Sequence, residues 1–412
     1  MKTEAEKTIY VDNAATTAMS DAAIAAMTPY LKNVYGNPSS LHTVGQTAKE
    51  ALDAARAIIA EKLNAEPSEI YFTSGGSEAD NQAIRSAAAN GLKRGKKHII
   101  STAFEHHAVL HTLKKLEREG FDVTYLDVHE NGVVTAQQVD EAIRPYTALV
   151  TVMFANNEIG TVQPIAEIGA VCRAHKITFH TDAVQAVGHV PIDVKAMNID
   201  MLSLSAHKFH GAKGVGALYV RRGVPLNAFI EGGAQERGRR AGTENLAGIA
   251  AMAAALDEAC ANMAQNASIE RALCDKIIAK LSEIPHSRLN GDREKRLPNI
   301  VNMCFEGIEG EGLLLLLDDK GICASSGSAC TSGSLDPSHV LLALGLPHEV
   351  AHGSLRISLS EYNTESDIDA IVEAVPQSVK YLRDISRMGS ARKGRKRTFD
   401  LIRNIIPHLR KE

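Results

Sequence analysis

Residues 70–128 read IYFTSGGSEADNQAIRSAAANGLKRGKKHIISTAFEHHAVLHTLKKLEREGFDVTYLDV, in which short β-rich runs alternate with longer helical segments. The β-rich runs are 70–74, 98–103 and 123–128, and the segments 78–95 and 107–120 between them have the apolar spacing of helices. These segments end near glycine or basic residues, as helices often do. Strands that alternate with helices usually form a mostly parallel sheet with helices on both faces. The stretch therefore predicts an α/β fold.

The alternation continues to about residue 220. Further strands are predicted in ALVTVMFA (148–155), ITFHTD (177–182) and MLSLSA (201–206), and a further helix is predicted over 164–176. After about residue 258 the pattern changes to a helix at 267–284, the segments 296–307 and 355–360, and a helix from 364 to about 385. We expect a large domain over 16–258, a smaller α+β domain formed by 1–15 and 259–388, and a basic tail at 389–412.

The composition is that of an ordinary soluble protein. Apolar residues make up 44% of the chain, and 45 basic against 49 acidic residues give a formal charge of −4. This charge argues against a direct nucleic-acid partner. The aliphatic run at 313–317 is far too short to span a membrane, and residues 1–13 have no apolar segment typical of a signal peptide. We expect a cytoplasmic protein.

The cysteines indicate free thiols. None belongs to a CxxC pair, and in a reducing compartment scattered cysteines stay unpaired. Cys323 and Cys330 lie seven positions apart, which fits common zinc sites poorly, so we predict no metal. The six cysteines are Cys172, Cys260, Cys274, Cys304, Cys323 and Cys330.

Polar residues follow several of the predicted strands, where ligands collect in parallel sheets. Gly76 and Ser77, in a glycine turn before a helix, could hold a phosphate at the helix N-terminus, although such turns are common by themselves. His106 follows another strand and could stack on a planar ring, although a lone histidine is usually structural. Asp182 ends an apolar strand, where it either pairs with a cation or caps a helix. Gln185 lies one turn further on.

Lys208 follows the buried strand of LSLSAHKFHGAKG (202–214), close to Ser205 and His207. Partial burial lowers the pKa of an amine and makes it a nucleophile toward carbonyl groups, whereas a surface lysine would have no such role. The predicted sheet edge thus combines a phosphate-binding turn, a planar side chain that can stack on a ring, a carboxylate and a nucleophilic amine. This combination fits a pyridoxal phosphate site. The lysine would form the Schiff base, and Asp182 would keep the ring nitrogen protonated.

A loop of small residues, ASSGSACTSGSL (324–335), carries Cys330. The stretch has no helical or strand period and is rich in residues that favour loops. It is either a linker with an incidental cysteine or a loop that presents a reactive thiol.

Five motifs closely resemble the NifS/IscS group of cysteine desulfurases: SAHKFHGAKGVGALYVRRG, HTDAVQAVG, FANNEIGTVQPI, QERGRRAGTEN and SSGSACTSGSLDPSHVL. The resemblance runs from about residue 8 to about 385, and GNPSSLH and ERGRRAGTEN are nearer the NifS type. It implies the fold type I of pyridoxal phosphate enzymes, a large domain with a mostly parallel seven-stranded sheet and a homodimer. It also implies conversion of L-cysteine to L-alanine, with the sulfur left on Cys330 as a persulfide.

The resemblance also assigns site residues. Lys208, His106 and Cys330 would be catalytic, and Cys330 could be a transient iron–sulfur ligand. The substrate would be bound by Arg356, Asn157 and Asn13. The cofactor would be held by Gly76, Ser77, His106, Asn157, Asp182, Gln185, Ser205, His207, Lys208 and, from the other subunit, Thr243.

Three matters stay open. A selenocysteine lyase or an aminotransferase of the same fold is the alternative, although a transaminase has no use for the SSGSAC loop. The sulfur acceptor would be a scaffold protein of the NifU/IscU type or another acceptor. The tail after about 388 resembles nothing assignable; it is a partner-binding amphipathic helix, a helix that packs on the protein itself, or a disordered segment.

Overall fold

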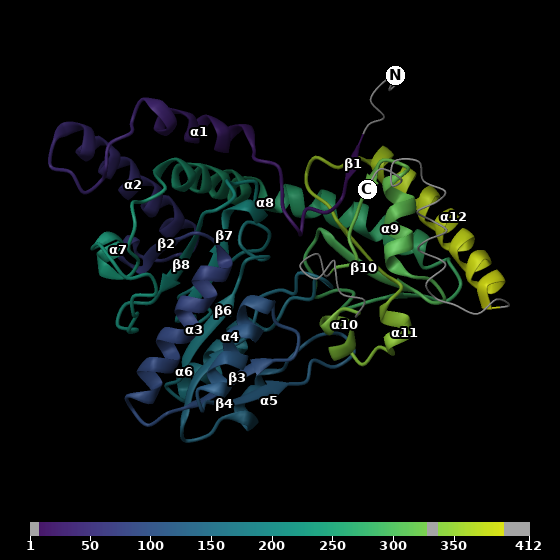
Figure 1. The fold of residues 1–412 in the computed structure, drawn as a ribbon, viewed down its shortest axis with the longest axis horizontal. Coiled ribbons are helices and arrows are strands. Elements are labelled where there is room, and N and C mark those ends of the chain that lie inside the picture. Colours follow the sequence, from purple (N-terminus) through teal and green to yellow (C-terminus); the bar gives the residue numbers. More distant parts are fainter. Residues whose placement is uncertain (1–7, 328–336, 391–412) are drawn as a thin grey trace.

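A seven-stranded sheet forms the centre of the larger part of the molecule (Figure 1). The computed structural model describes residues 8–327 and 337–390. The strand order is β2-β8-β7-β6-β5-β3-β4, and only β8 runs antiparallel to its neighbours. The strands are β2 (Ile70–Thr73), β3 (His98–Thr102), β4 (Asp122–Leu126), β5 (Thr147–Thr151), β6 (Thr178–Asp182), β7 (Met201–Ser205) and β8 (Gly216–Val220). The predicted mostly parallel α/β sheet is confirmed.

Helices cover this sheet because their apolar faces pack on it. In the helix His107–Arg118, for example, Val109, Leu113 and Leu116 are buried on one face, and the His106 side chain caps the N-terminus. The helices of this part are α1 (Asp21–Lys32), α2 (Thr43–Lys62), α3 (Gly76–Leu92), α4 (His107–Arg118), α5 (Ala136–Ala142), α6 (Ile165–Ala174) and α7 (Gln235–Gly238), with short 3-10 turns at η1 (Pro67–Glu69) and η2 (Ala206–Lys208).

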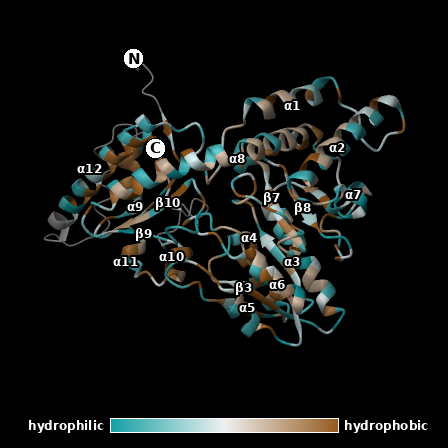
Figure 2. Cartoon of the chain, turned by 180° about the vertical axis from the view of Figure 1, so that it is seen from behind, coloured by the Kyte–Doolittle hydropathy of each residue, from teal (hydrophilic) through white to brown (hydrophobic). Residues whose placement is uncertain are grey.

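A smaller part surrounds an antiparallel sheet, in which β10 pairs with both β9 and β12. Its apolar core lies between these strands and the helices α9 and α12, where hydrophobic residues gather in Figure 2. Its elements are β9 (Ser287–Leu289), β10 (Ile300–Phe305), α9 (Gly310–Asp318), β11 (Ile322–Cys323), α10 (His339–Ala343), α11 (His348–Ala351), β12 (Ser354–Ser358) and α12 (Glu365–Ser390). The N-terminal strand β1 (Ile9–Tyr10) pairs with β11 in this part.

One long helix, α8 (Leu246–Leu281), connects the two parts (Figure 1). Its first residues, up to Leu256, belong to the core of the large sheet, and the residues from Leu273 onward belong to the core of the small one. By length and composition α8 could cross a membrane, but half of its apolar window is buried inside the protein, as in a core helix of a soluble protein. The predicted domain boundary at 258/259 falls inside this helix and stays a prediction.

Candidate functional site

A cavity of about 450 Å³ opens where β2 and β7 end and α3 begins. The turn requires glycine: Gly75 has φ 150°, and a Cβ on Gly76 would lie 2.5 Å from Cγ2 of Val184. Free N–H groups at a helix N-terminus attract anions, and Lys213 adds a positive charge. Four predicted phosphate ligands, Gly76, Ser77, Ser205 and His207, line this cavity, together with Thr16, Ser74, Gly75, Glu78, Lys213 and Gly214.

The Lys208 amine lies at the end of η2 against a turn from the N-terminal segment. Its Nζ donates hydrogen bonds to the carbonyl oxygens of Ala14, at 2.6 Å, and Ala15, at 2.8 Å. Nε2 of Gln185 donates to the same Ala14 oxygen at 2.9 Å. The Ala14 carbonyl therefore brings together two side chains that were predicted to bind the cofactor.

Asp182 and His106 meet at the edge of the sheet. The carboxyl groups of Asp182 and Asp80 and the imidazole of His106 each place one ligating atom within 4.8 Å of the others. Burial raises the pKa of Asp182 to about 6, although the nearby Lys208 and a hydrogen bond from the Val184 amide act in the opposite direction. A carboxyl group with this pKa can hold or release a proton close to neutrality.

The histidines of the site are neutral at pH 7. Burial, followed by the charge of Lys208, lowers the pKa of His106 to about 4. Burial also lowers the pKa of His207 to about 4, with Lys208 and Lys213 contributing, and its Nδ1 lies 3.1 Å from Oγ1 of Thr16. A neutral imidazole can stack on an aromatic ring without a charge to desolvate.

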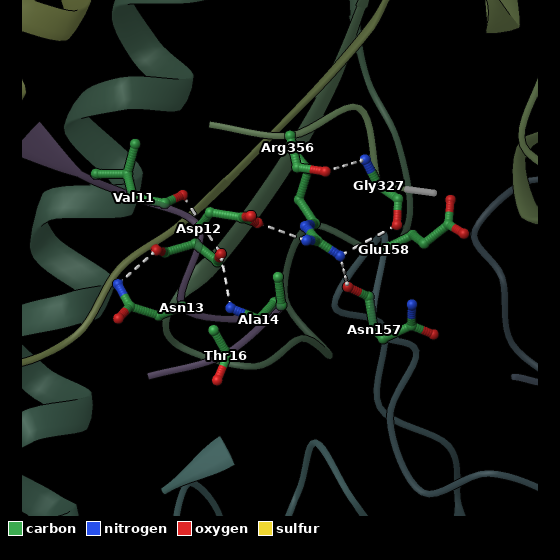
Figure 3. Close-up of polar contacts among 12 residues, drawn as sticks. Val11, Asp12, Asn13, Ala14, Thr16, Asn157, Glu158, Gly327 and Arg356 are labelled. Atoms are coloured by element: carbon green, nitrogen blue, oxygen red, sulfur yellow. Dashed lines mark hydrogen bonds and ion pairs between the residues drawn. The ribbon is translucent and has the colours of Figure 1, made fainter. Parts of the chain in front are cut away.

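Arg356, on β12, is buried behind the same N-terminal turn (Figure 3). Its guanidinium donates to Oδ1 of Asp12 at 2.7 Å and to the carbonyl oxygens of Asn157, at 3.0 Å, and Gly327, at 3.2 Å. Its buried Nε has no hydrogen-bond partner among the described residues. The guanidinium is thus partly occupied by Asp12, and an incoming carboxylate would compete with that side chain.

The two predicted substrate-binding asparagines differ in position. Nδ2 of Asn13 donates to the carbonyl oxygen of Ser358 at 3.0 Å, so this side chain ties the N-terminal turn to β12. The Asn157 carbonyl accepts from Arg356, as the dashed line in Figure 3 shows. Asn13 therefore has a structural contact, whereas Asn157 lies at the junction of the two parts.

Cys330 lies outside the described residues. Thr243 is exposed and is not among the residues that line the cavity of its own chain. The structure does describe both sides of the segment that carries Cys330: the carbonyl of Gly327 accepts from Arg356, and the Ser338 hydroxyl donates to the Glu158 carboxyl group.

Sequence reasoning missed four residues of the site. Asp12 binds Arg356, Thr16 lies beside His207, and Asp80 and Glu105 are buried carboxyl groups near Asp182 and His106. Burial raises the pKa of Glu105 to about 8. The position of Asp12 and Thr16 in the VDNAATT motif, next to Asn13, was the signal that could have revealed them.

The chain matches the Aminotransferase class-V family model over residues 9–371. It is 53% identical over 380 residues to the cysteine desulfurase IscS of Methanosarcina thermophila, which covers 92% of this chain and 94% of the relative. The chain belongs to the cysteine desulfurases of the class-V aminotransferase family. Among solved structures, a NifS-like protein superimposes with a TM-score of 0.86 at 37% identity, covering 91% of this chain and all (100%) of that one.

A second solved structure, described as SspA in complex with cysteine, has a TM-score of 0.77 and 40% identity, covering 87% of this chain and 100% of the other. Membership of this family confirms the predicted dependence on pyridoxal phosphate and the predicted substrate, L-cysteine. The similar proteins thus include both an IscS and a NifS-like protein.

The site of this cysteine desulfurase fits pyridoxal phosphate. The glycine turn at the α3 N-terminus suits the phosphate, and neutral His106 and the Asp182 carboxyl group suit the ring and its nitrogen. Asp80 Oδ1 is buried without a hydrogen bond among the described residues, which shows that this corner is incompletely satisfied by the protein alone. When bound, the cofactor withdraws electrons from the substrate carbon skeleton.

Proposed function

We propose that this cysteine desulfurase transfers the sulfur of L-cysteine to Cys330. The balanced reaction converts L-cysteine and the Cys330 thiol into L-alanine and a Cys330 persulfide: the C–S bond of the substrate breaks, an S–S bond forms, and the carbon skeleton takes up the proton. Selenocysteine lyase activity and transamination at the same site are the alternatives.

The proposed roles follow the contacts of the site. Lys208 binds the cofactor covalently and exchanges protons with the substrate, and its position is set by the Ala14 and Ala15 carbonyl oxygens. Asp182 would face the ring nitrogen of the bound cofactor, and His106 would stack on the ring. Gly76, Ser77, Ser205 and His207 hold the phosphate, while Gln185 and Asn157 contact the ring and Asn13 positions the turn beside the substrate.

Arg356 is the proposed anchor of the substrate carboxylate. Guanidinium groups bind carboxylates in bidentate pairs, and the unpartnered Nε of this buried side chain is one of the required donors. When the substrate enters, its carboxylate would displace Asp12 from Nη2 or share that donor with it. Before the substrate binds, the contact with Asp12 keeps the guanidinium in position.

The observation that carries the proposal is that Arg356 contacts the base of the segment containing Cys330. Its backbone N–H donates to the Ser325 carbonyl at 2.6 Å, and its side chain donates to the Gly327 carbonyl at 3.2 Å. Cys330 follows Gly327 by three residues, which span about 11 Å at most. A thiol tethered so close to the substrate anchor supports sulfur transfer and has no role in transamination.

We propose a homodimer in which Thr243 reaches the phosphate of the other subunit. Large apolar side chains are exposed on α1 and on the connection to α2: Leu31 is 64%, Tyr35 74% and Leu41 94% exposed. Such a surface is typical of an interface. The persulfide would pass to a scaffold protein of the NifU/IscU type or another sulfur acceptor in the cytoplasm.

The test compares the wild-type holoenzyme with a Cys330→Ser variant. After incubation with L-cysteine and no reductant, mass spectrometry of the wild type should find one extra sulfur atom on Cys330. The variant should still change the absorption of the bound cofactor when cysteine is added, because the binding residues remain. Its alanine production should fall about a hundredfold or more, since a hydroxyl is a poor nucleophile toward sulfur.

The control variant is Cys323→Ser, which removes a partly buried thiol on β11. It should retain alanine formation and the persulfide on Cys330. Full alanine production by Cys330→Ser, or a persulfide found only on Cys323, would refute the assignment. Formation of a keto acid instead of alanine by the wild type would favour transamination.

A further inference from the structure

The segment 230–243, which we call the arm, contains two consecutive residues in the left-handed backbone region. Glu236 has φ 48° and ψ 40°, and Arg237 has φ 57° and ψ 36°. Residues with a Cβ rarely adopt this region, and two in succession persist only where the surroundings hold them there. The contacts of both side chains identify what holds them.

Glu236 forms a buried bidentate ion pair with Arg56 of α2. The two N–O distances are 2.8 and 2.7 Å, and the side chains are 2% and 8% exposed. The same carboxylate also accepts the backbone N–H of Phe72 on β2 at 2.9 Å. The Arg56 guanidinium lies over the Phe72 ring and donates to the Ile70 carbonyl. All charges in this group are therefore paired.

Arg237 holds the arm on the other side of β2. Its guanidinium stacks over the Tyr71 ring, 4.1 Å from the centroid, and donates to the Ile70 carbonyl at 2.7 Å. Consecutive residues of the arm thus contact consecutive residues of one edge strand, which fixes both the position and the rotation of the turn.

The turn is connected to the far end of the arm through Gln235. Its Oε1 accepts the backbone N–H of Gly242 at 3.1 Å, directly before Thr243. The Ala241 N–H donates to the Ile230 carbonyl at 3.1 Å, and Arg240 pairs with Glu78 at 2.9 Å. A continuous series of contacts therefore runs from β2 through Glu236 and Gln235 to the backbone next to Thr243.

We propose that Gln235 and Glu236 are positioning residues that hold Thr243 at the cofactor phosphate of the partner subunit. The inference rests on the proposed dimer and the proposed role of Thr243. The strained turn therefore acts on the other chain. The arm is fixed to β2 and α2 of its own subunit, and it supports the cofactor site of the partner subunit.

The test uses heterodimers, because a role in the partner chain can be complemented. Two differently tagged chains are co-expressed and purified as the mixed species. One chain carries Lys208→Ala with an intact arm, and the other carries Gln235→Ala with an intact Lys208. At limiting pyridoxal phosphate, borohydride fixes the cofactor that Lys208 holds, and mass spectrometry of the Lys208 peptide gives its occupancy.

In the Gln235→Ala homodimer, half-maximal occupancy should need about tenfold more cofactor, since one hydrogen bond to a charged group is weakened. In the heterodimer the site with the remaining Lys208 receives the intact arm of the other chain. Its cofactor occupancy should therefore return to within about twofold of wild type. Glu236→Gln should behave in the same way with a larger loss. Glu231→Ala, an exposed change in the same arm, should leave occupancy unchanged.

A Thr243→Ala chain in the same pairing distinguishes the role of Thr243 in the partner subunit from the positioning role of Gln235 and Glu236. Recovery with Thr243→Ala but not with Gln235→Ala or Glu236→Gln would overturn the inference and leave the proposed dimer site intact. No recovery with either would refute the role of Thr243 in the partner chain, and the inference with it. Normal occupancy in both the Gln235→Ala and Glu236→Gln homodimers would also overturn it.

Discussion

Two of the regions that bury acidic side chains satisfy them in opposite ways. Next to β2, Glu236 is fully paired with Arg56 and accepts a backbone N–H as well. At the cofactor edge, Asp80 and Glu105 are equally buried, but each has one carboxyl oxygen without a hydrogen bond among the described residues. Burial raises the pKa of both groups. A fully paired buried carboxylate supports the architecture, whereas buried carboxyl groups with an unsatisfied oxygen mark where the protein has been shaped for chemistry.

The largest expected effect is a loss of activity, without a loss of stability, when the cofactor edge is altered. Lys208→Ala should lower alanine formation in the presence of a chemical reductant by about a thousandfold or more, because Lys208 is the amine proposed to bind the cofactor covalently. Its denaturation midpoint without cofactor should stay near that of wild type. A comparable rate of alanine formation would contradict the role of Lys208, and a large loss of stability would break the contrast between the two regions.

Glu236→Gln should lower stability, in addition to the weaker cofactor binding expected from its place in the arm. The change leaves the Arg56 guanidinium buried without its countercharge, which destabilises proteins by about 3–5 kcal/mol. Urea denaturation of the apoenzyme should show this loss. The double variant Arg56→Met, Glu236→Leu is the matched control and should recover most of it, since both buried charges are removed together. A single variant as stable as wild type would show that the ion pair does not support the architecture.

The smallest effect concerns pH. Glu105 has a folded pKa of about 8, above the value of about 4.5 expected in the unfolded chain, so the folded state binds the proton more tightly. Its contribution to stability is therefore fully present below about pH 4.5 and is lost as pH rises toward 8.

Glu105→Gln should flatten this dependence. The amide oxygen can still accept from Thr102 and from the Met153 N–H. Between pH 5 and pH 8 the wild type should lose about 3 kcal/mol of stability that the variant keeps. Urea denaturation at the two pH values measures the difference. The same pH dependence in both proteins would show that Glu105 is not a buried acid that keeps its proton.

The local chemistry of the sheet edge could be predicted from the sequence. Asp182 ends the buried strand β6, and Lys208 follows the buried strand β7 by three residues. Side chains at the carboxyl ends of neighbouring parallel strands must lie close together. Gly76 and Ser77 could be placed because a glycine turn between a strand and a helix has only a few geometries. The prediction that these residues share one site needed no information beyond strand order.

Contacts across long sequence separations could not be predicted in this way. Asp12 meets Arg356 and Thr16 meets His207 only because the chain returns after hundreds of residues, and no local pattern encodes that return. The first half of α8 was also missed. It is rich in alanine and apolar on most sides, so it lacks the periodicity of a surface helix. Strand β8 was missed as well, because GALYV has no alternating pattern.

Helix α8 also determines how the chain can be divided. Its 36 residues extend for about 54 Å, and each end is buried in a different core. Neither core can lose its part of α8 without exposing apolar side chains, and unwinding one end removes the support for the other. A fragment that ends at the apparent boundary near residue 258 would therefore cut through a shared structural element, and the two cores are expected to fold and unfold as one cooperative unit.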